Sequence, residues 1–234
     1  SVRPSTGQKI KKIIEENNYE PNVFARLKAK ESRVIGLTVP GFDSVTTPRL
    51  VEVIVEYLKK NDYTPLIMHT GNKIAEEIRS IERLKNMKTV QMADMIFAVG
   101  GGKSMDTCKA LADMLKKPVF TFPTIASNCA PVTALCILYG KDKVEFYDAQ
   151  KPAIHCFIDT KIISNAPIKY LRAGIGDALS KQYEVCFNTR GRVLNHTNNL
   201  GVQIAKDCSE RLLKYGVRAV DDAQKNIVSD EFIQ

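Results

Sequence analysis

The segment ADMIFAVGGG, residues 93–102, constrains the fold of this chain more than any other stretch. Apolar residues run through it almost without a break, which is typical of a strand buried on both faces of a parallel sheet. Three glycines end the run, and the following segment, SMDTCKALADML, is predicted to form a helix with Ser104 or Asp106 in its first turn. A buried strand that leads through a tight bend into a helix is the repeating unit of α/β proteins.

The same succession recurs along the chain. Apolar runs alternate with helical patterns, and the expected strands lie near residues 34–39, 65–69, 94–99, 118–122 and 154–158. The predicted fold class is therefore α/β, a doubly wound, Rossmann-like parallel sheet, over residues 34–170. A basic helical arm is expected over residues 1–33 and a further helical region over 171–234, where Tyr183 and Cys186, among others, follow helical spacing.

The glycine bend at residues 100–102 has two interpretations. Glycines let a backbone approach a pyrophosphate, and the amide N–H groups of the next helix then point at the negative charge. The bend does not match either common phosphate motif, because GxGxxG would need glycine at Met105 and a P-loop would need it at Phe97. Taken alone, the residues leave open both phosphate binding and a plain strand-to-helix turn.

Three segments in order carry a family resemblance. GGGKSMDTCKA, FPTIASNCAPVTALCILY and KPAIHCFIDTKIISNAPIKYLRAGIGDALSKQYE resemble the glycerol dehydrogenase and hydroxycarboxylate dehydrogenase branch of the iron-containing alcohol dehydrogenases, over roughly residues 82–234. The resemblance implies an NAD- or NADP-dependent oxidoreductase of polyols or 2-hydroxy acids. In such enzymes a divalent metal, zinc or iron, polarises the alcohol oxygen while carbon delivers hydride to the cofactor.

The resemblance also implies roles for particular residues. The residues implied to bind the cofactor are Gly100, Gly101, Gly102, Lys103, Asp106, Thr124, Ser127 and Leu135. Asp177, in GIGDAL, would ligate the metal. Cys129 stands where the glycerol enzymes carry an aspartate beside the substrate, and the loss of that carboxylate would favour an acidic substrate.

The metal site implied for Asp177 lacks its histidines. A catalytic zinc or iron needs about three protein ligands, and the family takes two histidines from helices well downstream of the aspartate. The three histidines of this chain are His69, His155 and His196. His155 is expected to be a core residue and His196 to be no ligand. We therefore expect weak metal binding and little or no dehydrogenase activity from this chain.

The first part of the chain carries a different resemblance. Residues 1–33 hold eight Lys or Arg against four Glu, which suggests a polyanionic partner or a solvated helix face, and a helix is expected from Ser5. Residues 19–40, and less closely those up to about 80, resemble the lactose-repressor family of transcription regulators. This resemblance implies weak, salt-dependent DNA contacts from Asn22, Ala25, Arg26 and Leu27, because the recognition helix is absent. The alternatives are thus a transcription regulator, or an inactive chimera joined near residue 80.

Cysteine usage and hydropathy bear on location. The six cysteines are scattered without CxxC pairs, as expected for reduced thiols in the cytosol, and no apolar run is long enough for a membrane span or a signal peptide. Apolar residues left exposed by the helical region predict a homo-oligomer.

Overall fold

The computed structural model describes residues 4–17, 33–39, 46–70 and 77–234. The chain divides into two compact units, Ser1–Arg33 and Val34–Gln234. The described part of the first unit is a helix, α1 (Pro4–Glu16), which begins within one residue of the predicted Ser5. Its lysines Lys9, Lys11 and Lys12 are exposed, so α1 presents a solvated, basic surface.

Five parallel strands form the sheet of the second unit. Their order is β2 (Thr64–His69), β1 (Val34–Val39), β3 (Met95–Gly100), β4 (Val119–Pro123) and β7 (His155–Cys156). The predicted doubly wound fold is confirmed, and four of the five strands lie within one residue of the expected bounds. β7 is shorter than predicted, since it pairs with β4 only at Phe120–His155 and Thr121–Cys156.

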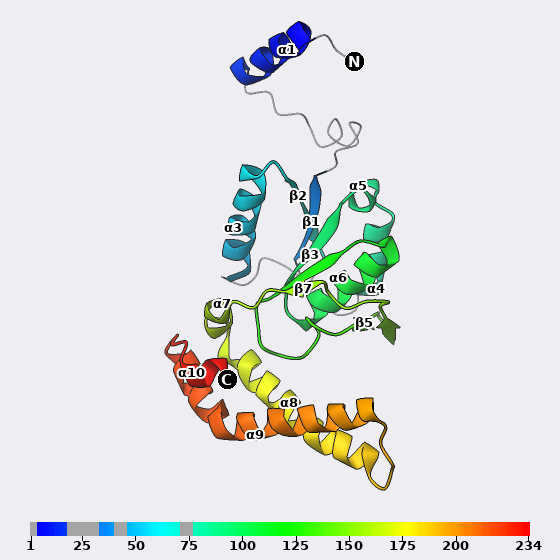
Figure 1. Cartoon of the computed structure of the whole chain (residues 1–234), viewed down its shortest axis with the longest axis vertical. Coiled ribbons are helices and arrows are strands. Elements are labelled where there is room, and N and C mark those ends of the chain that lie inside the picture. The colour runs from blue at the N-terminus through cyan, green and yellow to red at the C-terminus, as the bar shows by residue number, and fades with distance from the viewer. Residues whose placement is uncertain (1–3, 18–32, 40–45, 71–76) are drawn as a thin grey trace. The chain divides into compact units, whose positions relative to one another are not determined.

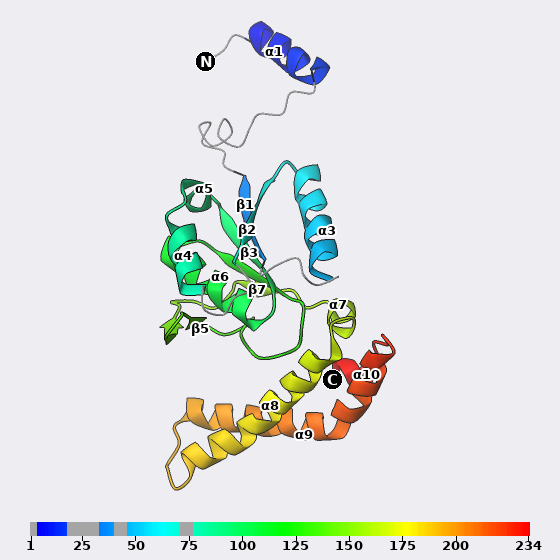
Figure 2. The same cartoon turned by 180° about the vertical axis from the view of Figure 1, so that it is seen from behind.

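Helices cover both faces of this sheet. Helix α3 (Thr46–Lys60) lies on one face, and α4 (Glu77–Lys85) and α6 (Gly102–Leu115) lie on the other (Figures 1 and 2). The short α5 (Lys88–Gln91) leads into β3. All six residues of β1 are buried, because the strand lies inside the sheet with helices above and below. This double cover explains the continuous apolar runs of the central strands.

An antiparallel hairpin packs against α6 and was not predicted from the sequence. It consists of β5 (Leu135–Tyr139) and β6 (Val144–Asp148). Cys136 and Leu138 of β5 are buried in the same core as Met105 and Leu111 of α6. Helix α6 is therefore covered by the sheet on one side and by the hairpin on another.

The last part of the chain is helical. It comprises α7 (Thr160–Ser164), α8 (Ile168–Thr189), α9 (His196–Gln224) and α10 (Asp230–Ile233). Asn195 caps the amino end of helix α9, and its side chain accepts a hydrogen bond from the Asn198 N–H at 2.8 Å. Helices α8 and α9 cross and pack against each other, and α10 folds back on the end of α9 (Figure 1). None of the helices in the described ranges has both the length and the apolar character needed to cross a bilayer.

Candidate functional site

The glycine bend joins β3 to α6. Gly100 has a φ of 142°, a conformation that side chains strongly disfavour, and its carbonyl accepts the Thr124 N–H at 2.9 Å. Gly101 is the N-cap of α6 and provides no side-chain cap. The first N–H groups of an α-helix have no partner within the helix. The bend therefore presents amide donors and the positive end of the helix dipole, which together favour an anion.

The bend lies at the point where the winding of the sheet reverses. From β1 the chain passes through α3 to β2 on one side, whereas from β3 it passes through α6 to β4 on the other. The carboxyl ends of the neighbouring strands β1 and β3 therefore feed helices on opposite faces. In open α/β sheets, ligands bind outside the carboxyl ends of the strands at such a switch point.

Thr124 is a predicted cofactor residue that the structure links to the bend by a hydrogen bond. It follows β4, is buried, and donates its backbone N–H to Gly100. Leu135 begins β5 and is 41% exposed, and its carbonyl accepts a hydrogen bond from Lys109 Nζ at 2.8 Å. The structure thus joins Thr124 directly to the bend and places Leu135 on the hairpin.

Lys103 and Asp106 extend from α6 toward the hairpin. Lys103 is exposed, with its Nζ 5.5 Å from the centroid of the Tyr139 ring. Asp106 is buried, pairs with Lys109 Nζ at 2.9 Å and accepts the Ile137 N–H at 3.2 Å. Desolvation by burial raises the pKa of Asp106, although Lys109 opposes the rise. The contacts of Asp106 therefore hold strand β5, and its assignment to the cofactor stays a prediction.

A small apolar cavity opens at the same edge of the sheet. Its volume is about 250 Å³, and it is lined by Leu50, Phe122, Pro123, Phe157, Ile158, Asp159 and Ile162. The rings of Phe122 and Phe157 stack with centroids 5.0 Å apart. Pro123 pairs with Gly100 across the sheet, so this cavity begins one strand away from the bend.

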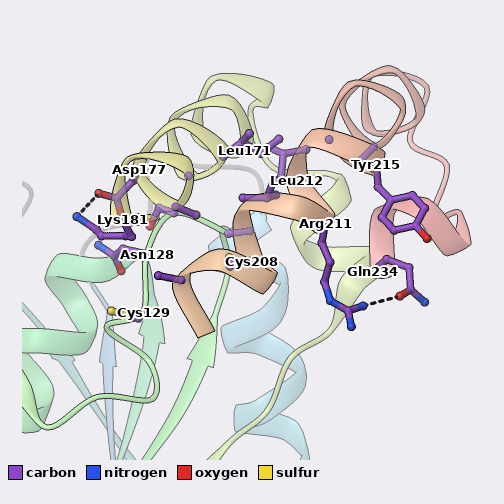
Figure 3. Close-up of a pocket in the computed structure, with 18 of the residues that line it drawn as sticks. Asn128, Cys129, Leu171, Asp177, Lys181, Cys208, Arg211, Leu212, Tyr215 and Gln234 are labelled. Carbon is purple, nitrogen blue, oxygen red and sulfur yellow. Dashed lines mark hydrogen bonds and ion pairs between the residues drawn. The ribbon is translucent and has the colours of Figure 1, made fainter. Parts of the chain in front are cut away.

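A larger cavity of about 650 Å³ lies between the segment 126–129 and helices α8, α9 and α10. Asn128, Cys129, Asp177 and Lys181 lie at one end, and Arg211 and Gln234 lie at the other (Figure 3). A Cβ added to Gly102 would come within 2.6 Å of Asn128 Nδ2. Asn128 therefore contacts the bend and also lines the cavity.

Two predicted residues, Ser127 and Asp177, line this larger cavity together with Cys129. Helix α8 approaches the loop closely, because a Cβ at Gly174 would lie 2.1 Å from the Ala126 carbonyl oxygen. Asp177 is half exposed and pairs with Lys181 Nζ at 3.3 Å. The cavity is mostly apolar along α8 and α9, with charged groups concentrated at its two ends.

The described residues do not make a metal centre by themselves. Within residues 4–17, 33–39, 46–70 and 77–234, no three His, Cys, Asp or Glu side chains are grouped closely enough to hold an ion. The expectation of a core position for His155 is wrong: this residue lies exposed on the edge strand β7, against Phe157. His69 ends β2 and His196 begins α9, and neither lines the cavity with Asp177.

Two buried charged residues were missed by the sequence analysis. Lys109 is 1% exposed and donates to the carbonyls of Thr133 and Leu135, besides pairing with Asp106. Glu77 is 4% exposed and accepts the Tyr139 N–H at 3.2 Å. Asp106 and Lys109 are three residues apart on a predicted helix, and this spacing indicates an ion pair that includes Lys109. No pattern in the sequence around Glu77 indicates that it is buried, because its burial depends on contact with the hairpin.

Comparison with known proteins gives a family match. The model of the family "Iron-containing alcohol dehydrogenase" matches residues 8–160. The chain belongs to the iron-containing alcohol dehydrogenase family. That single match includes most of the residues assigned above to a repressor-like parent and continues past residue 80, where the change of resemblance was expected. No lactose-repressor segment is indicated by the comparisons. Asn22, Ala25, Arg26 and Leu27 lie outside the described residues.

Individual relatives agree with this family. A glycerol dehydrogenase of Thermotoga maritima is 37% identical over 166 residues, which cover 68% of this chain and 44% of the relative. Hydroxycarboxylate dehydrogenase A of Escherichia coli is 36% identical, with 59% of this chain and 39% of the relative covered. The glycerol dehydrogenase structure from Schizosaccharomyces pombe superimposes with a TM-score of 0.69 at 26% identity, covering 85% of this chain and 50% of the other. The chain thus spans about two fifths of the length of these curated relatives.

Proposed function

We propose that this chain binds a nicotinamide dinucleotide, NAD or NADP, at the Gly100–Gly102 bend, as the cofactor-binding part of a polyol or 2-hydroxy acid dehydrogenase. The observation that carries the proposal is the uncapped amino end of α6 at the switch point of the sheet. The diphosphate would accept hydrogen bonds from the first amides of α6. When bound, the nicotinamide would accept hydride from the substrate carbon.

The small apolar cavity suits the other end of such a cofactor. Phe122 and Phe157 present stacked rings, and Leu50 and Ile162 close the sides. A planar purine gains dispersion and stacking energy against such rings. An adenine there and a diphosphate at Gly100 would occupy the carboxyl ends of adjacent strands.

A pair of substitutions at one position tests the diphosphate contact. Gly102→Pro removes one amide donor, yet proline fits the first turn of a helix, and Gly101 before it is extended (φ −95°, ψ −172°), not in the helical conformation that proline disfavours in its predecessor. Gly102→Ala is the matched control, because it adds a Cβ but keeps the N–H. Hydrogen bonds to charged groups contribute about 1.5–3 kcal/mol, so Gly102→Pro should weaken NADH binding about tenfold or more relative to Gly102→Ala. Calorimetric titration with NADH measures both, and equal affinities would count against the site.

For the substrate, we propose a 2-hydroxy acid or its keto form at least as readily as glycerol. Cys129 brings no negative charge to the cavity, and Lys181 and Arg211 line its walls. The names of the relatives include both substrate classes, glycerol dehydrogenase and hydroxycarboxylate dehydrogenase. Competition between lactate and glycerol for the NAD-bound chain, followed by calorimetry, would distinguish the two.

We further propose Asp177 as the metal-seeking residue, with zinc or iron as the ion. The described side chains do not supply the other ligands, so no catalytic step is derived through the metal. We expect at most weak metal binding and negligible NAD-dependent oxidation by this chain alone. An enzyme-like rate with glycerol or a 2-hydroxy acid would refute that expectation.

The DNA-binding alternative is supported by fewer observations. The exposed lysines of α1 favour phosphate contacts, but the residues expected to enter a groove lie outside the described ranges. Titration with duplex DNA at two salt concentrations tests it. An inactive chimera would bind neither DNA nor NADH.

For location and assembly, we propose a cytosolic homo-oligomer. The six cysteines are all free thiols, as expected in a reducing compartment. Several large apolar side chains of the final helices are more than two-thirds exposed, among them Tyr183, Phe187, Ile204, Leu213 and Val217. Analytical ultracentrifugation would show whether copies associate.

A further inference from the structure

Glu77 is a buried acid with no part in the site described so far. It begins α4, is 4% exposed, and accepts the backbone N–H of Tyr139 through Oε2 at 3.2 Å. Tyr139 ends β5, and its ring carries the Lys103 ammonium at 5.5 Å from the centroid. The acid and the cation therefore meet at the same residue, one at its backbone and the other at its ring.

Lys103 follows the glycine bend directly, so it is the cation closest in sequence to the proposed diphosphate. The charge of Lys103 also lowers the pKa of the Glu77 carboxyl group, although burial raises that pKa by more. A diphosphate at the bend and the Glu77 carboxylate would thus both be attracted to one ammonium group. Two anions that share one cation also repel each other.

We propose that Glu77 is a positioning residue that competes with the cofactor's diphosphate for Lys103, and so makes dinucleotide affinity depend on pH near neutrality. The inference rests on the proposed function, since it concerns the same bend. A protonated Glu77 leaves Lys103 to the diphosphate. An ionised Glu77 holds the ammonium over Tyr139 and adds a negative charge behind the site.

The direction of the pH effect follows from the environment of the acid. Burial raises the pKa of Glu77 from its ordinary value to about 7, with the Tyr139 N–H and Lys103 opposing the rise and Asp106 adding to it. As pH rises through about 7 the carboxylate forms, and affinity for an anion should fall. By linkage, binding of the anion favours the protonated acid, so the complex should take up protons near neutral pH.

The other charged groups around Glu77 are few among the described residues. From α6 they are Lys103 and Asp106, and Asp106 is itself paired with Lys109 at 2.9 Å. The hairpin contributes the Tyr139 N–H. Lys73 and Glu76 precede the helix in sequence and lie outside the described residues.

The test is calorimetric titration with NADH from about pH 6 to about pH 8.5, in buffers of different ionisation enthalpy, for the chain and two variants. NADH is chosen because its phosphodiester groups do not titrate in this range. Glu77→Gln keeps an acceptor for the Tyr139 N–H and removes the charge. Glu82→Gln removes an exposed charge from the same helix and is the matched control. Both variants retain His69 and His155.

We expect the affinity of the unmodified chain for NADH to fall about fivefold or more across this range, with fractional proton uptake near pH 7. Glu82→Gln should behave in the same way. Glu77→Gln should bind about as tightly at high pH as the unmodified chain does at low pH, without proton uptake. Circular dichroism checks that each variant is folded.

The outcomes separate the two proposals. If NADH binds but Glu77→Gln keeps the full pH dependence and proton uptake, the role of Glu77 is wrong and the dinucleotide site stands. If NADH does not bind the unmodified chain at any pH, both proposals fail. If Glu77→Gln does not fold, Lys103→Gln replaces it. That variant should bind more weakly at low pH and lose most of the pH dependence, and retention of the dependence would overturn the inference.

Discussion

Two Asp–Lys ion pairs, one on α6 and one on α8, show how differently the same residue types are used in this molecule. Asp106 and Lys109 lie 2.9 Å apart with side chains 10% and 0% exposed, whereas Asp177 and Lys181 lie 3.3 Å apart with side chains 45% and 46% exposed. Both aspartates were singled out from the sequence as functional residues. The first is enclosed by the core and holds the hairpin, and the second opens into a cavity where a ligand can reach it.

The helices that carry these pairs differ in the same way. Nine consecutive residues of α6, from Ser104 to Ala112, are buried, while no residue of α8 is. Helix α6 is packed between the sheet and the hairpin, so the glycine bend at its start is held in a fixed position. Preorganised binding of a diphosphate requires such a fixed bend. Helix α8 is exposed instead, so solvent and ligands can reach Asp177.

The comparison is tested most severely by removing one cation from each pair. Lys109→Met should lower the free energy of unfolding by about 3–5 kcal/mol, because the buried carboxylate of Asp106 and two carbonyls lose their partner. Lys181→Met should change it by less than about 1 kcal/mol, because water replaces the partner of an exposed acid. Urea denaturation of both variants measures the difference. Comparable losses from the two variants would show that the pairs are not distinguished by burial.

A second test addresses the contact between α8 and the segment 126–129. Gly174→Ala should destabilise the fold by about 1–3 kcal/mol, because the new Cβ would lie 2.1 Å from the Ala126 carbonyl oxygen and the backbone must move. Gly176→Ala is the control on the same helix, since nothing lies within 4 Å of its added Cβ. Urea denaturation reports both, and the control should be neutral or slightly stabilising. A neutral Gly174→Ala would mean that α8 does not rest on this segment.

The difference between the two regions also explains what could be predicted from the sequence. Strands β1, β3 and β4 and the bend at Gly100 were predictable, because burial on both faces forces continuous apolar runs and the left-handed φ of the bend needs glycine. The burial of Glu77 was not, since it depends on a hairpin whose strands are distant in sequence from α4, and the spacing of Asp106 and Lys109 indicates an ion pair without showing that the hairpin buries it. The exposure of His155 was also missed, because its segment is apolar in sequence but forms a strand at the edge of the sheet. At α8, the position of Asp177 on a cavity came from family resemblance and not from local pattern.

The smallest expected effect on stability is that of a substitution at Asp177, so this residue is tested by metal binding as well as by denaturation. Asp177→Asn should change the free energy of unfolding by less than about 1 kcal/mol, because its pair with Lys181 is half exposed. Mn²⁺ is a suitable probe because it prefers carboxylate oxygen, whereas Zn²⁺ would also bind the free thiols of the chain. In NMR spectra of the chain, Mn²⁺ should broaden the amide signals of α8 around residue 177. Asp177→Asn should abolish that broadening, and Lys181→Met should enhance it by releasing the carboxylate from its internal cation. Broadening centred instead on Asp207 and Glu210, exposed acids of α9 that do not line the cavity, would show that the metal binds elsewhere, and the assignment of Asp177 would be withdrawn.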